Sequence, residues 1–231
     1  MKLNLTHSQL IQICSANFAG ELMSAPLQEV IFDTRKIFQT EGVVFFALHG
    51  PKRKGFDYIQ EAYDKGIRSF VLDRRPEILH DNAHYYFVED TLSALQKIAS
   101  FHRKRIKYPI LAITGAIGKT TVKEWIYHLL ATQLKVHRSP KSYNSQLGVA
   151  LSLLELPLEG DLALIEAGVS KSGEMEKLQA MIAPDYVVLT TTKAAYRHEF
   201  ISQAAFQQAL HLLSTDSQWE LNGDLIDGKT S

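Results

Sequence analysis

The chain has 231 residues, 45% of them hydrophobic and 22% charged, which is enough for a packed core in one large domain or two small ones. Lysine plus arginine and aspartate plus glutamate both number 25, and the resulting formal net charge of zero argues against broad electrostatic binding of nucleic acid or of an acidic membrane surface. A single cysteine, Cys14, excludes an intrachain disulfide, and the polar start and the lack of an apolar run of about 20 residues argue against a signal peptide and a membrane span, so we expect a soluble cytoplasmic protein.

The first hundred residues show the pattern of a small α/β unit. Amphipathic or apolar segments bounded by polar residues predict helices over 7–14 and 58–66 and strands over 42–50, 68–73 and 84–90. A longer helix is predicted over 90–105, where Asp90 can cap the first turn and apolar residues fall on one face. This helix is expected to carry the chain into a second unit, with the domain boundary after residue 104.

Helices and strands alternate from Tyr108 onward. Strands are predicted over 108–114, 135–139, 161–169 and 184–192, and helices over 119–134, 145–156, 173–183 and 202–214. This alternation favours a parallel sheet with right-handed crossover connections, whose buried strands are nearly all apolar. The remaining stretch, 215–231, is polar and does not finish a domain, so the chain is expected to stop partway through a longer architecture.

The turn between the first of these strands and its helix reads TGAIGKTT over residues 114–121. Glycines such as Gly115 and Gly118 let a backbone approach a phosphate closely, and the amide groups at the start of a helix favour an anion. Lys119 is placed to reach the outer phosphates of a nucleotide, and the Thr120 hydroxyl is placed to bind Mg²⁺. The general phosphate-loop pattern has a further glycine where this chain has Ile113, so a glycine-containing turn with an incidental lysine is the alternative.

A second candidate position is Glu166, a lone acid that closes an apolar run. Open parallel sheets bind ligands beyond the carboxyl ends of their strands, which puts Glu166 at the same edge as the glycine turn. A carboxylate at this edge can hold the magnesium that bridges the phosphates. The alternative is an acid at the end of a strand that faces solvent.

Four segments of the second half occur in one order: TGAIGKTTVKE, SPKSYNSQLGVALSLLEL, IEAGVSKSGEM and VVLTTT. Together they resemble the ATP-binding central domain of the Mur ligases, which build the peptide stem of bacterial peptidoglycan. KTTVKE, and upstream DTRKIFQTEGVVFFALHGPKRKGFDYI at residues 33–59, are most similar to the branch that adds D-alanyl-D-alanine to UDP-N-acetylmuramoyl-tripeptide. SPKSYNSQLGV is similar to versions of that branch that are fused to an alanine racemase.

The resemblance implies a fold, a reaction and a set of ligands. The fold is α/β, with a small amino-terminal UDP-substrate domain over 1–104 and an incomplete parallel-sheet central domain of the P-loop ATPase type over 105–231. The family's third domain, which binds the incoming amino component, has no counterpart. The implied reaction is ATP-driven amide formation through an acyl phosphate, with ATP and Mg²⁺ as cofactors and UDP-N-acetylmuramoyl-tripeptide and D-alanyl-D-alanine as partners.

The resemblance also implies roles for individual residues. The ATP phosphates would be bound by Gly115, Ala116, Gly118, Lys119, Thr120 and Thr121. Thr120 and Glu166 would hold the magnesium, and Lys119 and Glu166 would be the catalytic residues. The UDP-linked substrate would be bound by Thr34, Arg35, Ala47, Gly50 and Asn144.

Two departures from the family pattern affect the expected activity. The family usually has asparagine at the position of Ile117, and an isoleucine cannot make the hydrogen bonds of that amide, although the backbone of the turn can still bind phosphate. After the VVLT strand, Thr191, Lys193 and Tyr196 replace an asparagine, a glycine and a histidine. That histidine is a ligand of the family's second magnesium, and a neutral tyrosine is a poor replacement.

The neighbourhood of the expected second metal offers no clear substitute. His198 would need a changed loop path to reach the metal, and a lone histidine is more often a surface residue. Gln207 and Gln208 stand in the helix where the family has a lysine that it modifies to a carbamate. The sequence therefore predicts weak binding of ATP–Mg²⁺ and no ligase turnover by this chain alone.

Three functions are open from the sequence. The first is a peptidoglycan ligase or its amino-terminal part, and the second is a non-catalytic nucleotide-binding module derived from one. The third is a P-loop kinase or NTPase acting on an unrelated substrate, which the upstream segment at residues 33–59 argues against.

Overall fold

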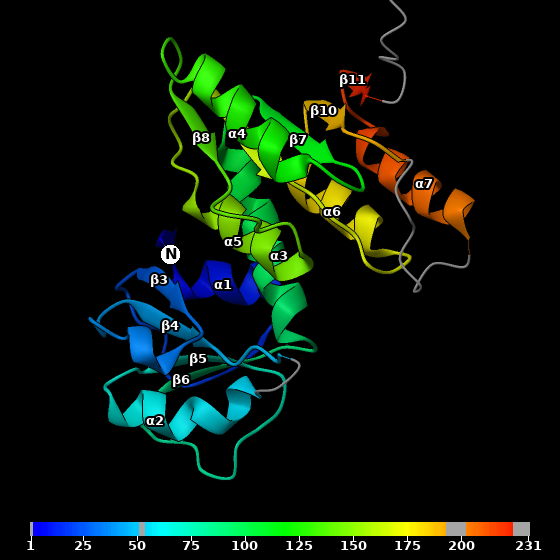
Figure 1. Cartoon of the computed structure of the whole chain (residues 1–231). Coiled ribbons are helices and arrows are strands. Elements are labelled where there is room, and N and C mark those ends of the chain that lie inside the picture. The colour runs from blue at the N-terminus through cyan, green and yellow to red at the C-terminus, as the bar shows by residue number, and fades with distance from the viewer. Residues whose placement is uncertain (1, 51–53, 193–201, 224–231) are drawn as a thin grey trace, which may run out of the picture. The chain divides into compact units, whose positions relative to one another are not determined.

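The computed structural model describes residues 2–50, 54–192 and 202–223 (Figure 1). The chain divides into two compact units, Met1–Phe101 and His102–Ser231. The division falls within helix α3, Thr91–Arg105, which was predicted over 90–105. Each unit is built around its own sheet.

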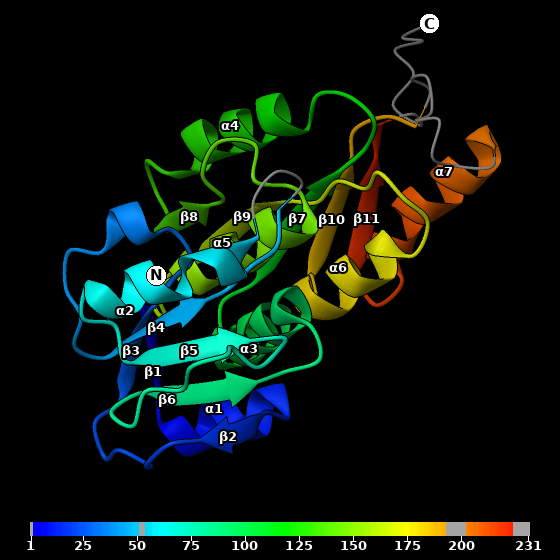
Figure 2. The same ribbon diagram turned by 90° about the horizontal axis from the view of Figure 1, so that it is seen from below.

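The first unit contains a six-stranded mixed sheet in the order β1-β3-β4-β5-β6-β2 (Figure 2). The strands are β1 Lys2–Leu5, β2 Asn17–Ala19, β3 Leu27–Ile31, β4 Val43–Phe46, β5 Ser69–Leu72 and β6 His84–Phe87. The four inner strands are parallel, and β1 and β2 pair antiparallel at the two edges. The helices are α1 His7–Cys14 and α2 Ile59–Asp64, with short 3₁₀ turns at η1 Thr34–Lys36 and η2 Gly55–Tyr58.

The sequence predicted α1, α2 and the strands β4 to β6 of this unit, but it missed β1, β2 and β3. The missed strands are short or carry polar residues between their apolar ones, as in KLNL and LQEVI. The strands that were found carry three or four consecutive apolar or aromatic residues, and β4 and β5 are buried along their whole length. Apolar runs therefore revealed the buried centre of the sheet and not its margin.

The second unit contains a five-stranded sheet in the order β11-β10-β7-β9-β8, and every pair in it is parallel, as predicted. The strands are β7 Ile110–Thr114, β8 Val136–Arg138, β9 Leu162–Glu166, β10 Tyr186–Leu189 and β11 Trp219–Asn222. The helices are α4 Lys119–Leu130, α5 Gln146–Glu155, α6 Glu174–Ile182 and α7 Gln203–His211, followed by the 3₁₀ turn η3 Leu212–Ser214.

Helices cover both faces of this sheet, with α4 on one side and α6 on the other (Figure 2). On the α4 side, Val122 and Ile126 pack against Leu111, Ile113 and Leu164. All five residues of β7 are buried because both of its faces are covered, which is why its sequence is an unbroken apolar run.

The last strand was not predicted. Residues 215–231 were interpreted as polar and outside any finished domain, yet β11 extends the sheet by pairing in parallel with β10, with Val188 opposite Leu221. An edge strand has only one hydrogen-bonded neighbour and tolerates polar residues, and Leu221 itself is 44% exposed. Neither a run of apolar residues nor a regular alternation of apolar and polar residues therefore marks this strand in the sequence.

Candidate functional site

The glycine turn lies between β7 and α4, as the sequence predicted. Gly115 has φ of +129°, and a Cβ atom at this residue would lie 2.2 Å from Thr190 Oγ1 and 3.0 Å from the backbone nitrogens of Thr190 and Thr191. Gly118, the N-cap residue of α4, has φ of +87° and no atom within 4 Å of the space that a Cβ would fill. The positive φ favours glycine at both positions. At Gly115 the close approach of Thr190 and Thr191 also excludes a Cβ, whereas the space beside Gly118 is open.

Two residues that follow β10 form hydrogen bonds with the backbone of this turn. Thr190 Oγ1 donates a hydrogen bond of 2.6 Å to the carbonyl of Ile117, and the Ala116 amide donates one of 2.8 Å to the carbonyl of Thr191. The Ile117 side chain is 66% exposed. Thr190, which the sequence analysis did not single out, therefore bonds to the backbone of the turn at Ile117, whereas the Ile117 side chain itself points to solvent.

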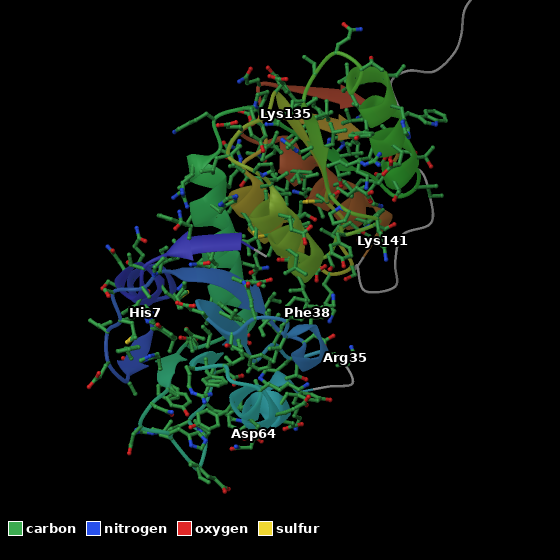
Figure 3. All side chains as sticks on the ribbon, turned by 90° about the vertical axis from the view of Figure 1, so that its left-hand side faces the viewer. His7, Arg35, Phe38, Asp64, Lys135 and Lys141 are labelled. Atoms are coloured by element: carbon green, nitrogen blue, oxygen red, sulfur yellow. The ribbon has the colours of Figure 1, made fainter. Side chains whose placement is uncertain are left out.

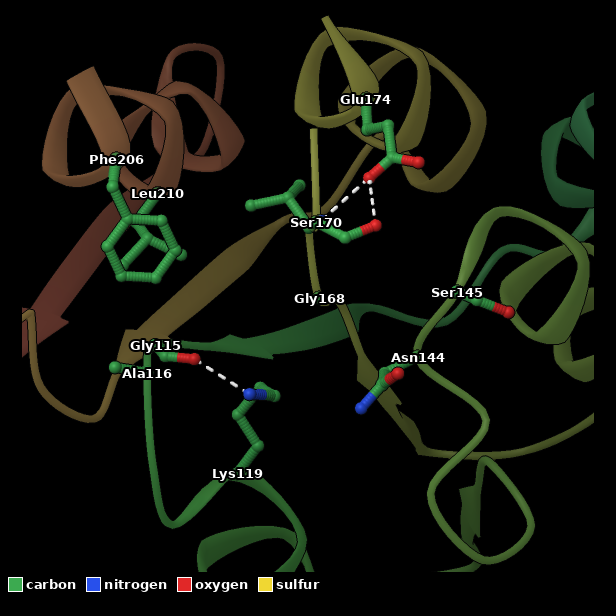
Figure 4. Close-up of a pocket in the computed structure, with 11 residues that line it drawn as sticks. Gly115, Ala116, Lys119, Asn144, Ser145, Gly168, Ser170, Glu174, Phe206 and Leu210 are labelled. Atoms are coloured by element: carbon green, nitrogen blue, oxygen red, sulfur yellow. Dashed lines mark hydrogen bonds between the residues drawn. The ribbon is translucent and has the colours of Figure 1, made fainter. Parts of the chain in front are cut away.

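A pocket of about 520 Å³, including the part open to solvent, lies beside the turn (Figure 4). Its lining is formed by Gly115, Ala116, Lys119, Asn144, Ser145, Gly168, Val169, Ser170, Glu174, Phe206 and Leu210. The Lys119 ammonium donates a hydrogen bond of 2.7 Å across the turn to the Gly115 carbonyl. The structure thus brings Asn144 to the same pocket as the turn and Lys119, whereas the Thr121 side chain is exposed and the Ala116 amide already bonds to Thr191.

Thr120 and Glu166 meet next to this pocket. Glu166 closes β9 directly opposite Ile113 of β7, and its side chain is fully buried. The Thr120 hydroxyl donates a hydrogen bond of 3.0 Å to Glu166 Oε2, and Ser142 Oγ lies 3.3 Å from Thr120 Oγ1. A hydroxyl and a carboxylate are the hard oxygen donors that Mg²⁺ uses together with the phosphates of a nucleotide, so this donor set fits the expected ion.

No other arrangement of ligands competes with this pair in the part of the chain that the structure describes. Among those residues, no group of three or more histidine, cysteine, aspartate or glutamate side chains is placed to hold a metal ion. A magnesium that arrives with a nucleotide needs only one or two protein ligands, because phosphate and water oxygens complete its shell. The geometry therefore suits a nucleotide-borne ion better than a permanently bound one.

Glu174 is a pocket residue that sequence reasoning missed. Its Oε2 accepts hydrogen bonds from the Ser170 amide at 2.7 Å, the Ser170 hydroxyl at 3.1 Å and the Lys171 amide at 2.9 Å (Figure 4). Burial by itself would raise the pKa of Glu174, but these hydrogen bonds outweigh burial and lower the pKa. The available signal was an acid directly after Gly173 at the start of α6, where a carboxylate is favoured.

In the first unit, the predicted substrate residues follow neighbouring parallel strands. Thr34 is buried in η1 after β3, and its carbonyl accepts a hydrogen bond of 3.1 Å from Lys65 Nζ. Ala47 is buried after β4, and its carbonyl accepts a hydrogen bond of 3.2 Å from the Thr91 hydroxyl. Gly50 is exposed farther along the same loop. Thr34 and Ala47 therefore come to the same carboxyl edge of the sheet.

Arg35 is exposed on η1 (Figure 3). Its guanidinium forms two hydrogen bonds with the carboxylate of Asp33, from Nε at 2.8 Å and from Nη2 at 2.7 Å. These bonds to Arg35 lower the pKa of Asp33 to about 2. At the ends of β4 and β5, His49 Nε2 lies 2.5 Å from Asp73 Oδ2, a pair that the sequence analysis did not identify.

The residues on which we based the expected loss of a second metal site are described only in part, because Lys193, Tyr196 and His198 lie outside the described residues. Thr191 is described, and its carbonyl accepts the hydrogen bond from the Ala116 amide. Gln207 donates a hydrogen bond of 3.3 Å to the hydroxyl of the buried Thr192. Gln208 is exposed.

The described helices also bear on the absence of a membrane span that the sequence predicted. None of them combines the length and the apolar character needed to cross a bilayer.

Known proteins match most of this chain, and a family model matches most of its second half. Residues 113–213 match the Mur ligase middle domain family. UDP-N-acetylmuramoyl-tripeptide--D-alanyl-D-alanine ligase of Bacillus subtilis (strain 168) is 30% identical over 180 residues, which are 78% of this chain and 39% of that protein. The enzyme of the same name from Escherichia coli (strain K12) is 30% identical over 209 residues, which are 90% of this chain and 44% of that protein.

Solved structures agree on the fold. A crystal structure of MurF from Acinetobacter baumannii superposes with a TM-score of 0.85 at 21% identity, covering 95% of this chain and 50% of that one. The MurF ligase of Thermotoga maritima in complex with ADP gives a TM-score of 0.75 at 23% identity, covering 84% of this chain and 45% of that one. The α/β fold is thus that of the amino-terminal and middle domains of MurF, and the chain spans about half the length of these relatives or less.

Proposed function

We propose that the chain, whose residues 113–213 match the Mur ligase middle domain family, is the nucleotide-binding and UDP-substrate-binding part of a D-alanyl-D-alanine-adding ligase of peptidoglycan synthesis. The observation that carries the proposal is the meeting of Thr120 and Glu166 beside the glycine turn and Lys119. A lone phosphate loop would leave the substrate class open. The similarity to the D-alanyl-D-alanine ligases extends upstream of this loop and supports the choice of substrate.

In this proposal the second unit binds ATP. The turn from Gly115 to Gly118 and the start of α4 receive the phosphates, because an open backbone and a helix N-terminus favour an anion. Thr120 and Glu166 hold the magnesium, which when bound neutralises charge on the phosphates. The Lys119 ammonium exchanges the Gly115 carbonyl for a phosphate oxygen and stabilises charge on the transferring phosphoryl group.

The UDP-linked tripeptide is the second proposed ligand. Thr34, Arg35, Ala47 and Gly50 form its binding edge in the first unit, and Asn144 lies in the pocket beside the nucleotide. The substrate carboxylate would attack the γ-phosphate of ATP, releasing ADP and giving an acyl phosphate, and the amine of D-alanyl-D-alanine would then attack the acyl carbon, forming the amide and releasing inorganic phosphate. A carboxylate is a poor electrophile without this activation, which is why the reaction consumes ATP. The expected fusion to an alanine racemase stays a prediction.

A non-catalytic nucleotide-binding module is the second candidate. Gln207, which stands where the family has a carbamate-forming lysine, donates a hydrogen bond to Thr192 and brings no negative charge for a second metal. Hard divalent cations prefer carboxylate and other negatively charged oxygen ligands, so an amide–hydroxyl pair would be a weak substitute for a carbamate at such a metal. The two candidates share the ATP site and differ in the reaction.

Calorimetric titration tests the shared part of both candidates. ADP and ATP are titrated into the chain with Mg²⁺ and, separately, with EDTA. We expect binding that Mg²⁺ strengthens and that Thr120→Val weakens in Mg²⁺ more than in EDTA, because valine keeps the shape of threonine and removes the hydroxyl. Absence of binding heat in Mg²⁺ would contradict the nucleotide site.

Two further measurements test the substrate and the reaction. A rise in melting temperature with UDP-N-acetylmuramoyl-tripeptide is expected for the ligase part and not for an unrelated P-loop NTPase. Phosphate release that depends on the tripeptide and on D-alanyl-D-alanine, measured with this chain alone, would show turnover and exclude the non-catalytic module.

A further inference from the structure

Lys123 is a charged residue with no exposure to solvent, on the second turn of α4. Lysine is almost never fully buried unless its ammonium is paired. None of the roles assigned above to the glycine turn, the metal pair or the pocket involves this side chain. Its burial therefore needs a separate explanation.

The ammonium of Lys123 joins three parts of the second unit. It lies 2.9 Å from Glu166 Oε1, at the end of β9. It donates hydrogen bonds to the carbonyls of Ser139 at 2.8 Å and Lys141 at 2.5 Å, in the loop that follows β8. The two carbonyls accept two of the three N–H groups of the ammonium, Glu166 Oε1 forms an ion pair with it, and Glu124 Oε1 at 3.3 Å adds a second negative charge.

These contacts fix the orientation of the Glu166 carboxylate. With Oε1 beside Lys123, Oε2 is left to accept the hydrogen bond from the Thr120 hydroxyl. Without the ammonium, the carboxylate would be buried without a counter-charge and free to turn about its last torsion angle. Lys123 therefore holds the Glu166 carboxylate in the orientation in which one oxygen faces the ammonium and the other faces Thr120, on the side of the phosphate turn.

The same ammonium holds the loop that leads to the pocket. Lys141 has φ of +49°, a conformation that costs free energy in a residue with a side chain and needs compensating contacts. The residue after it, Ser142, places its hydroxyl 3.3 Å from Thr120 Oγ1, and Asn144 lines the pocket two residues later. Lys123 thus connects both Glu166 and this loop to the helix that begins at the phosphate turn.

We propose that Lys123 is a positioning residue for the metal that accompanies the nucleotide: it orients Glu166 and the 139–142 loop around Thr120 without touching ligand. The inference rests on the proposed function, because it presupposes a nucleotide–magnesium site at Thr120 and Glu166. A purely structural lysine is the competing explanation. The two explanations predict different effects on ADP binding. Loss of a positioning residue should weaken only the part of the affinity that Mg²⁺ contributes, whereas general structural damage should weaken ADP binding with and without Mg²⁺.

The test compares the wild-type chain with Lys123→Met and with Lys177→Met, a matched change of an exposed lysine on α6. The dissociation constant of ADP is measured by calorimetry in Mg²⁺ and in EDTA, and the ratio of the two gives the strengthening due to Mg²⁺. Loss of a residue that orients a metal ligand typically lowers metal affinity about 10- to 100-fold. We expect the ratio to fall at least about 10-fold, or to unity, in Lys123→Met, with the EDTA value within about 2-fold of wild type.

The outcomes are distinguishable. An unchanged ratio in Lys123→Met, or an equal loss of ADP affinity in Mg²⁺ and in EDTA, would overturn the positioning role. If Lys123→Met does not melt cooperatively, Lys123→Gln is titrated instead, since its amide keeps two N–H donors for the loop carbonyls but carries no charge. The same fall in the ratio is expected, and an unchanged ratio again overturns the inference. A wild-type chain whose ADP affinity does not respond to Mg²⁺ would refute the proposed metal site itself.

Discussion

Replacing Gly115 by alanine tests whether the phosphate turn is shaped by its contact with the end of β10. Two costs are expected for Gly115→Ala. The backbone conformation at φ of +129° is rarely adopted by residues with a side chain and costs about 1–3 kcal/mol. The new methyl group would also lie 2.2 Å from Thr190 Oγ1, and relieving such overpacking costs about 1–3 kcal/mol more. The sum is a loss of about 2–6 kcal/mol in the free energy of unfolding.

Gly118→Ala is the matched control. This residue also has a positive φ, +87°, but no atom lies within 4 Å of the position that its Cβ would take. Only the backbone cost of about 1–2 kcal/mol is then expected. The difference between the two variants reports mainly on the packing of Gly115 against Thr190 and Thr191, together with the different backbone conformations of the two glycines.

Urea unfolding measures this difference, followed by far-UV circular dichroism and by tryptophan fluorescence. Both tryptophans of the chain, Trp125 and Trp219, belong to the second unit, so fluorescence reports on the unit that contains the turn. The midpoint should fall for both variants and distinctly more for Gly115→Ala, with little change in slope. Equal midpoints for the two variants, or a Gly115→Ala protein as stable as wild type, would refute the reasoning.

Three further predictions follow from single contacts. The Arg103 guanidinium donates hydrogen bonds to the carbonyls of Ile182 and Ala183 and to the Asp185 carboxylate. We expect Arg103→Ala to lower the free energy of unfolding of the second unit by about 2 kcal/mol in urea. An unchanged unfolding midpoint would contradict this. Cys14 is buried and its pKa is raised to about 12 by burial, so iodoacetamide at pH 8 should label it only after unfolding; rapid labelling of the native chain would argue against this packing. The carboxyl of Asp33, held by Arg35, should titrate near pH 2 in a carbon-detected NMR experiment, and its pKa should return toward 3.8 in Arg35→Ala. Because the folded-state pKa is the lower one, the pair stabilises the fold above about pH 4 and this stabilisation is lost as the pH falls toward 2.

The parts of the fold that could be predicted from sequence are those where one physical requirement dominates. Buried parallel strands such as β7 and β9 are apolar up to their last residue, and the helices between them carry clear one-sided patterns. The placement of Glu166 opposite Ile113 followed from the rule that parallel strands end at one edge. The strands that were not predicted are the edge strands β1, β2 and β11 and their neighbour β3. They are short or partly polar, and their pairing is decided by neighbours distant in sequence.

Some residues of the candidate site could likewise be predicted from the sequence, and others could not. Its glycines, Lys119 and Thr120 were recognisable because a phosphate turn needs those residue types at fixed spacing. Thr190 and Lys123 were not, because each acts through a contact with residues distant in sequence, a backbone carbonyl for Thr190 and a buried carboxylate for Lys123. Glu174 was missed although its contacts with Ser170 and Lys171 are local. A lysine inside an amphipathic helix looks like any surface lysine until the sheet beneath it is known.

The hydrogen bonds from the end of β10 to the phosphate turn bear on the kinetics of association. Thr190 Oγ1 bonds to the Ile117 carbonyl and the Thr191 carbonyl accepts from Ala116, so the turn is ordered before any ligand arrives. A preorganised loop has little conformational entropy left to lose on capture of a ligand. Encounter with a nucleotide should then proceed in a single concentration-dependent phase in stopped-flow mixing, with no slow first-order step for loop closure.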